Sequence, residues 1–401
     1  MESKKIALFG GGPACIIAAI FLSKKHEVHI YEKGNTIGRK FLVAGKGGFN
    51  LTNQSLIGNL DTAFLMHPIL KKAVQRFDAV ALQNWFLKMG IKTYVGTSGR
   101  VFPERGIKPI EVLEKLKAAM LTNGVKIHTN HTFIGFDKKI QPIVEYRNKN
   151  LPHSVKSVSI KANQYIFGLG GGSWKITGSN SEWLNYFKDI DIETKPFESS
   201  NCGLNCDFNP EFIQKFEGKP LKNIQISIND YKIKGEALIT KYGLEGNAIY
   251  PIVPLVRKSL KNNSKTSIYI DLKPNNSTKE LLQKITNKKI ATKNYGYVFN
   301  LEKVQIQLLK NTLSKKDYLN PLSFAKQIKN VPVIIQSLRP VEEAISTVGG
   351  IVMSQINSSF NLIKQPHISI IGEMLDWDAP TGGFLLQTCF SSGYSVASSL
   401  D

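Results

Sequence analysis

Two glycines and one glutamate near the start of the sequence have the spacing of a dinucleotide site. In the segment "IALFGGGPAC", Gly10 and Gly12 follow an apolar run, and Glu32 comes 22 residues after Gly10. Gly10 allows a sharp turn, and Gly12 leaves room for a pyrophosphate beside the backbone. Glu32 can accept hydrogen bonds from an adenosine ribose. Cys15 replaces the third glycine of the G-x-G-x-x-G pattern, and its small side chain still permits close packing of helix on strand.

These residues need a strand, a turn, a helix and a second strand to position them. We expect strands over 6–9 and 28–31 and a helix over 13–22 that begins at Pro13. The helix start would present free N–H groups and the positive end of its dipole to the phosphates. An export signal is the alternative for this apolar run. The glycines and Pro13 would break its helix, and no cleavage site follows cleanly.

A second set of chemically informative residues lies near the end of the sequence. A buried strand in "HISIIGE" ends at Gly372 and Glu373, and Thr381 is expected to cap a helix that begins with Gly382 and Gly383. An acid after a strand can bind ribityl hydroxyls, and a helix start can stabilise negative charge at N1 of a reduced flavin. A turn without a ligand would have a similar sequence. The N-terminal nucleotide turn favours the flavin interpretation.

Two more glycine-rich segments indicate close approach of the backbone to a ligand. Residues 35–53, "NTIGRKFLVAGKGGFNLTN", are predicted to form a long ordered loop, in which Arg39, Lys40 and Lys46 supply positive charge. A strand over 165–169 runs into Gly170, Gly171 and Gly172.

The remaining pattern predicts an α/β domain with an insertion. Helices are expected over 63–76, from Asp78 to Met89 and over 109–123, and "GRVFP" is expected to form a turn. Segments between 125 and 169 predict a small antiparallel layer that returns to the main sheet. The residue pattern changes near Lys195, where predicted strands are followed by a lysine-rich helical segment. A further strand is expected over 331–338.

Composition narrows the class of protein. The 401 residues suffice for one large or two to three smaller domains, and no run of eighteen apolar residues lies outside the glycine-broken opening. Four cysteines in this length do not suggest a disulfide scaffold, so we expect a reducing, cytoplasmic location.

The net charge of +21 attracts polyanions in general. Most of the excess is lysine, as a compositional bias would produce, and no arginine-rich block occurs, so we expect no specific nucleic-acid partner. Three of the seven arginines stand in motif-like segments, namely Arg39, Arg100 and Arg339. Arginine offers a planar charged fork that lysine cannot mimic.

Several segments in fixed order resemble the BaiN-like FAD-binding flavoproteins, also called YhiN-like or aminoacetone-oxidase-like. These are "GGGPAC", "IYEKGNTIGRKFLVAGKGGFNLTN", "GRVFP", "GLGGGSWKITGS", "GEALITKYGLEGNAIYPI", "AISTVGGI" and "GEMLDWDAPTGGFLLQTCFSSGY". The resemblance implies an α/β fold: a Rossmann-like FAD domain of the glutathione-reductase type, interrupted by an inserted domain that is partly β-barrel-like and partly helical. We expect the FAD domain over 1–193 and 339–401 and the insert over 194–338, with its helical part near 274–328.

The resemblance, together with the glycine-rich segments, assigns cofactor contacts along the whole chain. The expected FAD-binding residues are Gly10, Gly12, Pro13, Ala14, Glu32, Lys33, Arg39, Lys40, Asn50, Phe133, Gly170, Gly171, Gly372, Glu373, Gly382, Gly383 and Phe384. Two motifs depart from the family pattern. "GKGGFN" stands where many relatives have "GGGRCN", which puts Gly48 and Phe49 at the arginine and cysteine positions, and "TGSNSEW" stands for "TGSTGDG".

These observations predict an FAD-dependent oxidoreductase that passes a hydride between flavin N5 and a small organic substrate, with NAD(P)H as a transient donor. No catalytic acid or base and no metal ligand is assigned, although Lys46 and Arg100 are candidates for substrate-facing charge. A thiol–disulfide reductase is disfavoured, because three residues separate Cys202 from Cys206. A flavoprotein of tRNA modification and a flavin sensor without turnover remain alternatives.

Overall fold

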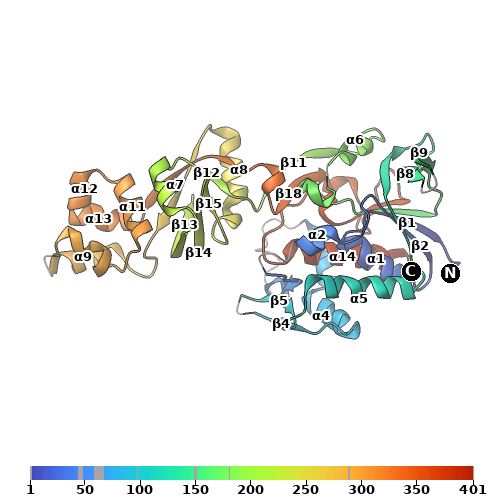
Figure 1. Ribbon diagram of the computed structural model, residues 1–401, viewed down its shortest axis with the longest axis horizontal. Coiled ribbons are helices and arrows are strands. Elements are labelled where there is room, and N and C mark those ends of the chain that lie inside the picture. The colour runs from blue at the N-terminus through green and yellow to red at the C-terminus, as the bar shows by residue number, and fades with distance from the viewer. Residues whose placement is uncertain are drawn as a thin grey trace. The chain divides into compact units, whose positions relative to one another are not determined.

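The computed structural model describes residues 2–43, 48–57, 67–96, 98–148, 151–179, 181–287 and 290–400. The chain forms two compact units (Figure 1). Unit 1 comprises Met1–Glu198 and Ser346–Asp401, and unit 2 comprises Ser199–Ile345. Unit 2 is therefore an insertion into unit 1. The insertion begins five residues later and ends seven residues later than the expected 194–338.

The centre of unit 1 is a parallel five-stranded sheet in the order β19-β10-β1-β2-β6. Its strands are β1 (Lys5–Phe9), β2 (Glu27–Glu32), β6 (Lys126–Thr129), β10 (Gln164–Phe167) and β19 (Ile368–Ile370). Ile6 to Phe9 are fully buried, and the Phe9 ring contacts the ring of Phe133, which belongs to a separate antiparallel sheet of unit 1. The expected α/β fold with a Rossmann-type domain is confirmed.

Three helices of unit 1 position the nucleotide turn: α1 (Pro13–Leu22), α5 (Pro109–Thr122) and α14 (Phe384–Leu400). Helix α1 packs against both of the others. A Cβ at Gly393 of α14 would collide with the carbonyl oxygen of Ala14, so this glycine allows α14 and α1 to lie in close contact.

The other elements of unit 1 surround this centre. β3, β5 and β4 form one small antiparallel sheet, β7, β8 and β9 form another, and β11 pairs with β18. The bounds are α2 (Arg39–Val43), β3 (Thr52–Asn53), η2 (Gln54–Ile57), α3 (Pro68–Arg76), α4 (Ala79–Lys88), β4 (Thr93–Val95), β5 (Arg100–Pro103), β7 (His131–Phe136), β8 (Pro142–Asn148), β9 (Leu151–Ser159), η3 (Lys175–Thr177), α6 (Trp183–Lys188), β11 (Thr194–Ser200), β18 (Ser346–Ile351), η7 (Met353–Gln355) and η8 (Gly372–Met374).

Several predicted elements of unit 1 have the expected ends. Asp78 caps α4 by accepting hydrogen bonds from the amides of Val80 and Ala81, and α5 ends before Gly124, which has a φ of +77°. The helix expected over 63–76 is described from Pro68 onward, and residues 58–66 lie outside the described part.

Four local predictions are wrong. "GRVFP" forms strand β5, because it pairs with β3 and β4. The segment expected to be a long loop contains helix α2, which begins at Arg39. β6 joins the parallel sheet beside β2, because the turn after Gly124 brings it to that edge. The last helix begins at Phe384, because Gly382 and Gly383 have positive φ angles of +97° and +104° that helical residues do not adopt.

Unit 2 contains a closed six-stranded barrel in the order β12-β15-β14-β13-β16-β17. The expected strand over 331–338 coincides with β17. The barrel strands are β12 (Leu204–Cys206), β13 (Pro220–Ile228), β14 (Tyr231–Thr240), β15 (Gly243–Glu245), β16 (Thr266–Asp271) and β17 (Val331–Leu338), and the connecting helices are α7 (Pro210–Phe216), η4 (Tyr250–Ile252), α8 (Val253–Asn262) and η6 (Val341–Glu343).

A helical part lies between β16 and β17 of unit 2. It comprises α9 (Thr278–Asn287), η5 (Thr292–Asn294), α10 (Tyr295–Val298), α11 (Lys303–Thr312), α12 (Lys315–Leu319) and α13 (Pro321–Ile328). Its buried side chains, including Leu308, Phe324 and Ile328, belong to the same core as the barrel. Within the described ranges, no helix is long and apolar enough to span a membrane.

Candidate functional site

The turn after β1 has the geometry that a bound pyrophosphate requires. Gly10 has a φ of +100°, and its amide donates a hydrogen bond to the Tyr31 carbonyl oxygen at 2.8 Å. A Cβ at this position would lie 2.5 Å from the carbonyl oxygen of Gly168. Any side chain at position 10 would therefore push the turn away from the end of β10.

The start of α1 leaves amide donors available for a ligand. Gly12 caps the helix without a side-chain hydrogen bond, and Pro13 occupies its first turn. Among the described residues, the amides of Gly12 and Ala14 have no hydrogen-bond acceptor in the protein. Free donors at the positive end of a ten-residue helix suit a phosphate.

Glu32 lies beside this turn, at the end of β2. One of its carboxylate oxygens accepts a hydrogen bond from the Gly11 amide and the other from the Gly34 amide, both at 2.6 Å. These bonds fix the carboxylate, and each oxygen keeps a lone pair for a ribose hydroxyl. Burial lowers the pKa of the neighbouring Lys33 ammonium, against the attraction of Glu182 and Glu32.

Cys15 takes the place of the third glycine through a compensating change elsewhere. Cys15 is fully buried, and a Cβ built at Gly168 would lie only 2.6 Å from its Sγ atom. A glycine at the end of β10 thus provides the space that a glycine in α1 would have provided. The sequence departs from the motif, but the close packing of helix on strand is kept.

One pocket in unit 1 brings together most of the predicted contacts from both ends of the chain. Of the expected residues, Gly10, Gly12, Pro13, Ala14, Glu32, Lys33, Arg39, Lys40, Phe133, Gly170, Gly372 and Glu373 line it. Gly171, Asn50, Gly382, Gly383 and Phe384 are not among its lining residues. Lys46 lies outside the described residues.

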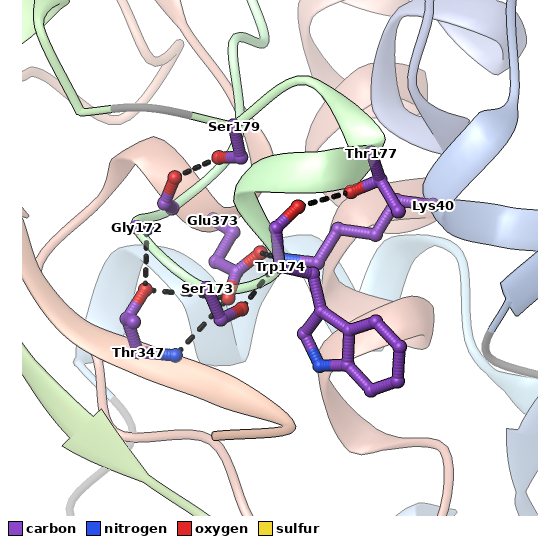
Figure 2. A network of polar contacts seen from close by, with 9 residues as sticks. Lys40, Gly172, Ser173, Trp174, Thr177, Ser179, Thr347 and Glu373 are labelled. Carbon is purple, nitrogen blue, oxygen red and sulfur yellow. Dashed lines mark hydrogen bonds and ion pairs between the residues drawn. The ribbon is translucent and has the colours of Figure 1, made fainter. Parts of the chain in front are cut away.

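Figure 2 shows Lys40 of α2 beside Glu373 of η8, and both residues line this pocket. Lys40 Nζ lies 2.7 Å from Glu373 Oε2 and donates to the Ser173 hydroxyl at 2.9 Å. The Thr347 amide donates to Glu373 Oε1 at 3.1 Å, and the Thr347 hydroxyl accepts from the Gly172 amide at 3.1 Å. The buried Glu373 carboxylate therefore has both oxygens held, with a cation as its partner.

Arg39, the residue before Lys40, also hydrogen-bonds to the segment that follows β10. Its Nη2 donates to the Ile176 carbonyl oxygen at 3.0 Å. Consecutive residues of α2 thus hold the segment after β10, Lys40 at Ser173 and Arg39 at Ile176. This arrangement gives both cations of "GRK" a role in shaping the wall of the pocket.

The remaining predicted residues meet at the start of α14. Gly383 lies so close to Asn50 and Thr52 that a Cβ there would be 2.7 Å from Asn50 Nδ2. Asn53 Nδ2 donates to the Gly382 carbonyl oxygen at 3.1 Å. A Cβ at Gly382 would lie 3.2 Å from Arg100 Nε, so the guanidinium of β5 adds positive charge to this helix start.

Sequence reasoning missed three hydroxyl residues of the polar network around Lys40 and Glu373. Ser173, Ser179 and Thr347 are all buried, and the Ser179 hydroxyl donates to the Gly171 carbonyl oxygen. A Cβ at Gly171 would collide with Thr347 Oγ1, so this glycine makes room for the network rather than for the pocket. Only the hydroxyl residues inside "GLGGGSWKITGS" and "AISTVGGI" could have indicated these positions.

The four cysteines are free and buried. Burial and the nearby Glu373 raise the pKa of Cys389 to about 12, and burial raises the pKa of the Cys206 thiol. Thiols that stay protonated are poor nucleophiles. This chemistry does not suit a thiol–disulfide reductase.

The pocket fits an extended dinucleotide. Unclaimed amides at α1 suit the pyrophosphate, Glu32 suits a ribose, and Glu373 suits ribityl hydroxyls some distance further along. When bound, FAD would supply hydride chemistry at its flavin ring.

Comparison with known proteins agrees with this geometry. The HI0933-like protein Rossmann domain family matches residues 4–399. The ribosomal RNA dihydrouridine synthase of Haemophilus influenzae is 23% identical over 411 residues, which cover 98% of this chain and 97% of that protein. The 3-dehydro-bile acid delta(4,6)-reductase of Clostridium scindens is 22% identical over 425 residues, with 97% of both chains covered.

A solved structure shares the fold. The 3-ketosteroid delta1-dehydrogenase of Sterolibacterium denitrificans superposes with a TM-score of 0.52 at 11% sequence identity, over 100% of this chain and 99% of that one. The resemblance to BaiN-like flavoproteins is confirmed by the family match. The chain belongs to the HI0933-like family of FAD-binding Rossmann proteins, and it is an FAD-dependent oxidoreductase.

Proposed function

We propose that this protein reduces a carbon–carbon double bond that is conjugated to a carbonyl group. The observation that carries the proposal is that two relatives with unrelated substrates are both named for saturating such a bond, and both align with this chain almost end to end. One product is dihydrouridine, and the other reaction removes unsaturation from a 3-dehydro bile acid. The two relatives therefore share the type of reaction and differ in their substrates.

The reaction has a simple balance. Bound FAD would supply a hydride for the carbon β to the carbonyl, and a proton from solvent would complete the saturation at the α carbon. NAD(P)H is proposed as the transient donor that restores the hydride. The residues of this chain supply binding and electrostatics: free amides at α1 for phosphates, Glu32 and Glu373 for hydroxyls, and Arg100 with the start of α14 for negative charge.

The cofactor contacts remain part of the proposal. We propose that Gly10, Gly12, Pro13, Ala14, Glu32, Lys33, Arg39, Lys40, Phe133, Gly170, Gly372 and Glu373 bind FAD through the described pocket, which supports them. We propose that Asn50, Gly382, Gly383 and Phe384 bind its flavin end, which the approach of Asn50 to Gly383 supports. Gly171 acts through Thr347 and Glu373.

Anaerobic titration tests the reaction. The yellow FAD-loaded protein is bleached with NADH or NADPH and then mixed with a conjugated enone, a saturated ketone of the same size, or uridine. Recovery of the flavin colour with stoichiometric loss of the double bond is expected for the enone or for uridine only. Recovery with the saturated ketone, or with no acceptor except dioxygen, contradicts the proposal and favours a different oxidoreductase or a sensor.

A further inference from the structure

Trp174, in the segment after β10, has a backbone conformation that large side chains rarely adopt. Ten of the described residues other than glycine have a positive φ, and seven of these are Asn, Asp or Ser, which tolerate it. The other three are Ile140, Trp174 and Phe360, with φ angles of +57°, +59° and +65°. Bulky residues are strained in this conformation, so the surrounding structure must hold each of them there.

Core packing explains two of these three residues. Phe360 is fully buried, and Ile140 packs against the hydrophobic core of unit 1. Trp174 is partly exposed, and it belongs neither to that core nor to the side chains packed against it. Burial in the core therefore does not offset the strain at Trp174.

The indole of Trp174 is also without a ring partner. Within the described ranges it has no aromatic contact, and its Nε1 has no hydrogen-bond acceptor. In contrast, Trp85 stacks on Phe21 with 5.9 Å between the ring centroids, and Trp183 meets Phe187 edge-on at 5.8 Å. An aromatic ring whose face is not covered by the protein suits a second planar ring.

Hydrogen bonds on both sides fix the backbone at this residue. The Trp174 carbonyl oxygen accepts from the amide and from the hydroxyl of Thr177, each at 2.8 Å. Ser173, the residue before it, accepts from Lys40 Nζ at 2.9 Å. A rigid segment thus imposes the strained conformation and sets the direction of the indole.

This segment adjoins the part of the pocket that suits a ribityl chain. Lys40 and Glu373 line that part, and Lys40 bonds to both Glu373 and Ser173. Figure 2 shows the indole of Trp174 directed away from Glu373, so it takes no part in the polar network. The isoalloxazine ring of FAD is attached directly to the ribityl chain and therefore follows Glu373 along the cofactor.

We infer that the indole of Trp174 contacts the isoalloxazine ring of bound FAD, and that the strained backbone is kept because it directs the indole there. Both rings are planar π systems, which gain more from contact than their buried area alone provides. The inference rests on the cofactor contacts proposed above and is independent of the substrate.

Flavin fluorescence of the FAD-loaded full chain tests this contact. An indole that touches an excited flavin transfers an electron to it and then recovers it, which quenches the emission, whereas a phenyl ring does not. Trp174→Phe is expected to raise the emission per bound flavin. Trp85→Phe is the matched control, because Trp85 is also partly exposed and its ring stacks on Phe21. Unchanged emission in Trp174→Phe, or an equal rise in the control, would overturn the inference.

Cofactor affinity gives a second measurement of the same contact. Trp174→Ala removes the stacking ring and is expected to weaken FAD binding about fivefold in calorimetry, whereas Trp174→Phe should stay within about twofold. Equal affinity of Trp174→Ala and the parent protein would contradict a contact with the cofactor.

Unfolding of the apoprotein in urea separates this contact from a structural role. Trp174→Gly relieves the positive φ and removes a side chain that the core does not use, so the midpoint should rise. Ile140→Gly relieves the same strain but removes a packed side chain, so the midpoint should fall. An equal fall in both variants would make the indole a structural element and overturn the inference. None of these measurements uses a substrate, so failure of the proposed reduction on an enone leaves their outcome unchanged.

Discussion

At the scale of single residues, the position of Gly10 makes the clearest prediction. Gly10→Ala places a methyl group 2.5 Å from the Gly168 carbonyl oxygen at a φ of +100°. Gly124→Ala is the matched control, because Gly124 also has a positive φ, +77°, with nothing within 4 Å of its Cβ position. We expect the control to cost about 1 kcal/mol of stability and to bind FAD normally.

The Gly10 variant should lose at least tenfold in FAD affinity, measured by calorimetry on the apoprotein. Its turn must move away from β10, and the amides at α1 move with it. Unchanged FAD affinity in Gly10→Ala would show that the pyrophosphate is bound elsewhere.

Arg100 makes a prediction about flavin electrostatics. Its guanidinium lies by the start of α14, and among the described residues it has no hydrogen-bond partner. Arg100→Gln should lower the midpoint potential of bound flavin by about 30 mV, equivalent to ~1.4 kcal/mol for two electrons, because the reduced ring carries negative charge. Arg105→Gln, an exposed cation over Tyr94, is the control. Equal potentials in all three proteins would place the flavin ring away from Arg100.

The residue scale also shows what sequence reasoning can reach. Gly10, Gly12, Glu32 and Glu373 were predicted as cofactor contacts because each suits a chemical role that only a few residue types fill, and the structure brings them into the lining of one pocket. Thr347 was not, because its partner Gly172 is 175 positions away and a buried threonine has many uses. Such hydroxyls are recognised only after the fold brings the two segments together.

At the scale of elements, the Lys40–Glu373 pair joins α2 to η8. Lys40→Met leaves a buried carboxylate without its cation, which should cost about 3 kcal/mol, whereas Lys40→Met with Glu373→Gln should recover most of that loss. Urea unfolding of both single variants and the double variant measures the coupling. Additive losses would show that the two side chains do not depend on each other.

The edge formed by β2 and β6 predicts a pH dependence. Burial and the neighbouring His29, whose Nδ1 lies 3.0 Å from His128 Nε2, lower the pKa of His128 to about 4. The unfolded chain binds this proton near pH ~6.5. Between these values the unfolded state holds more protons, so the free energy of unfolding falls as the pH falls.

His128 is partly exposed, and screening reduces the effect to about 1 kcal/mol. His128→Asn should flatten this part of the stability curve in urea titrations between about pH 7 and about pH 4. The same slope in variant and parent would assign the acid sensitivity to other groups.

Elements were predictable where the signal is local. β17 has its expected ends, and α5 ends where Gly124 requires it. β5 was missed because a four-residue strand owes its conformation to β3 and β4, which lie elsewhere in the sequence. The start of α14 was misplaced because the conformations of Gly382 and Gly383 depend on Asn53 and Asn50.

At the scale of the whole molecule, two compact units predict two responses to cofactor. Every described lining residue of the pocket belongs to unit 1. FAD at a hundred times its dissociation constant should stabilise unit 1 by about 2.7 kcal/mol and leave unit 2 unchanged. Calorimetric scans with and without FAD should show one transition that moves and one that stays. A single transition that moves as a whole would mean that the units unfold together.

The close contact of α14 with α1 has a consequence for biosynthesis. Eight of the ten residues of α1 are buried, and part of their cover is α14, which is synthesised only after the whole of unit 2. While unit 2 is being translated, the apolar residues of α1 therefore lack the part of their packing that α14 supplies. The pocket that η8 completes is not fully lined until unit 2 has been synthesised, and the half-made polypeptide is the form most exposed to aggregation or chaperone binding.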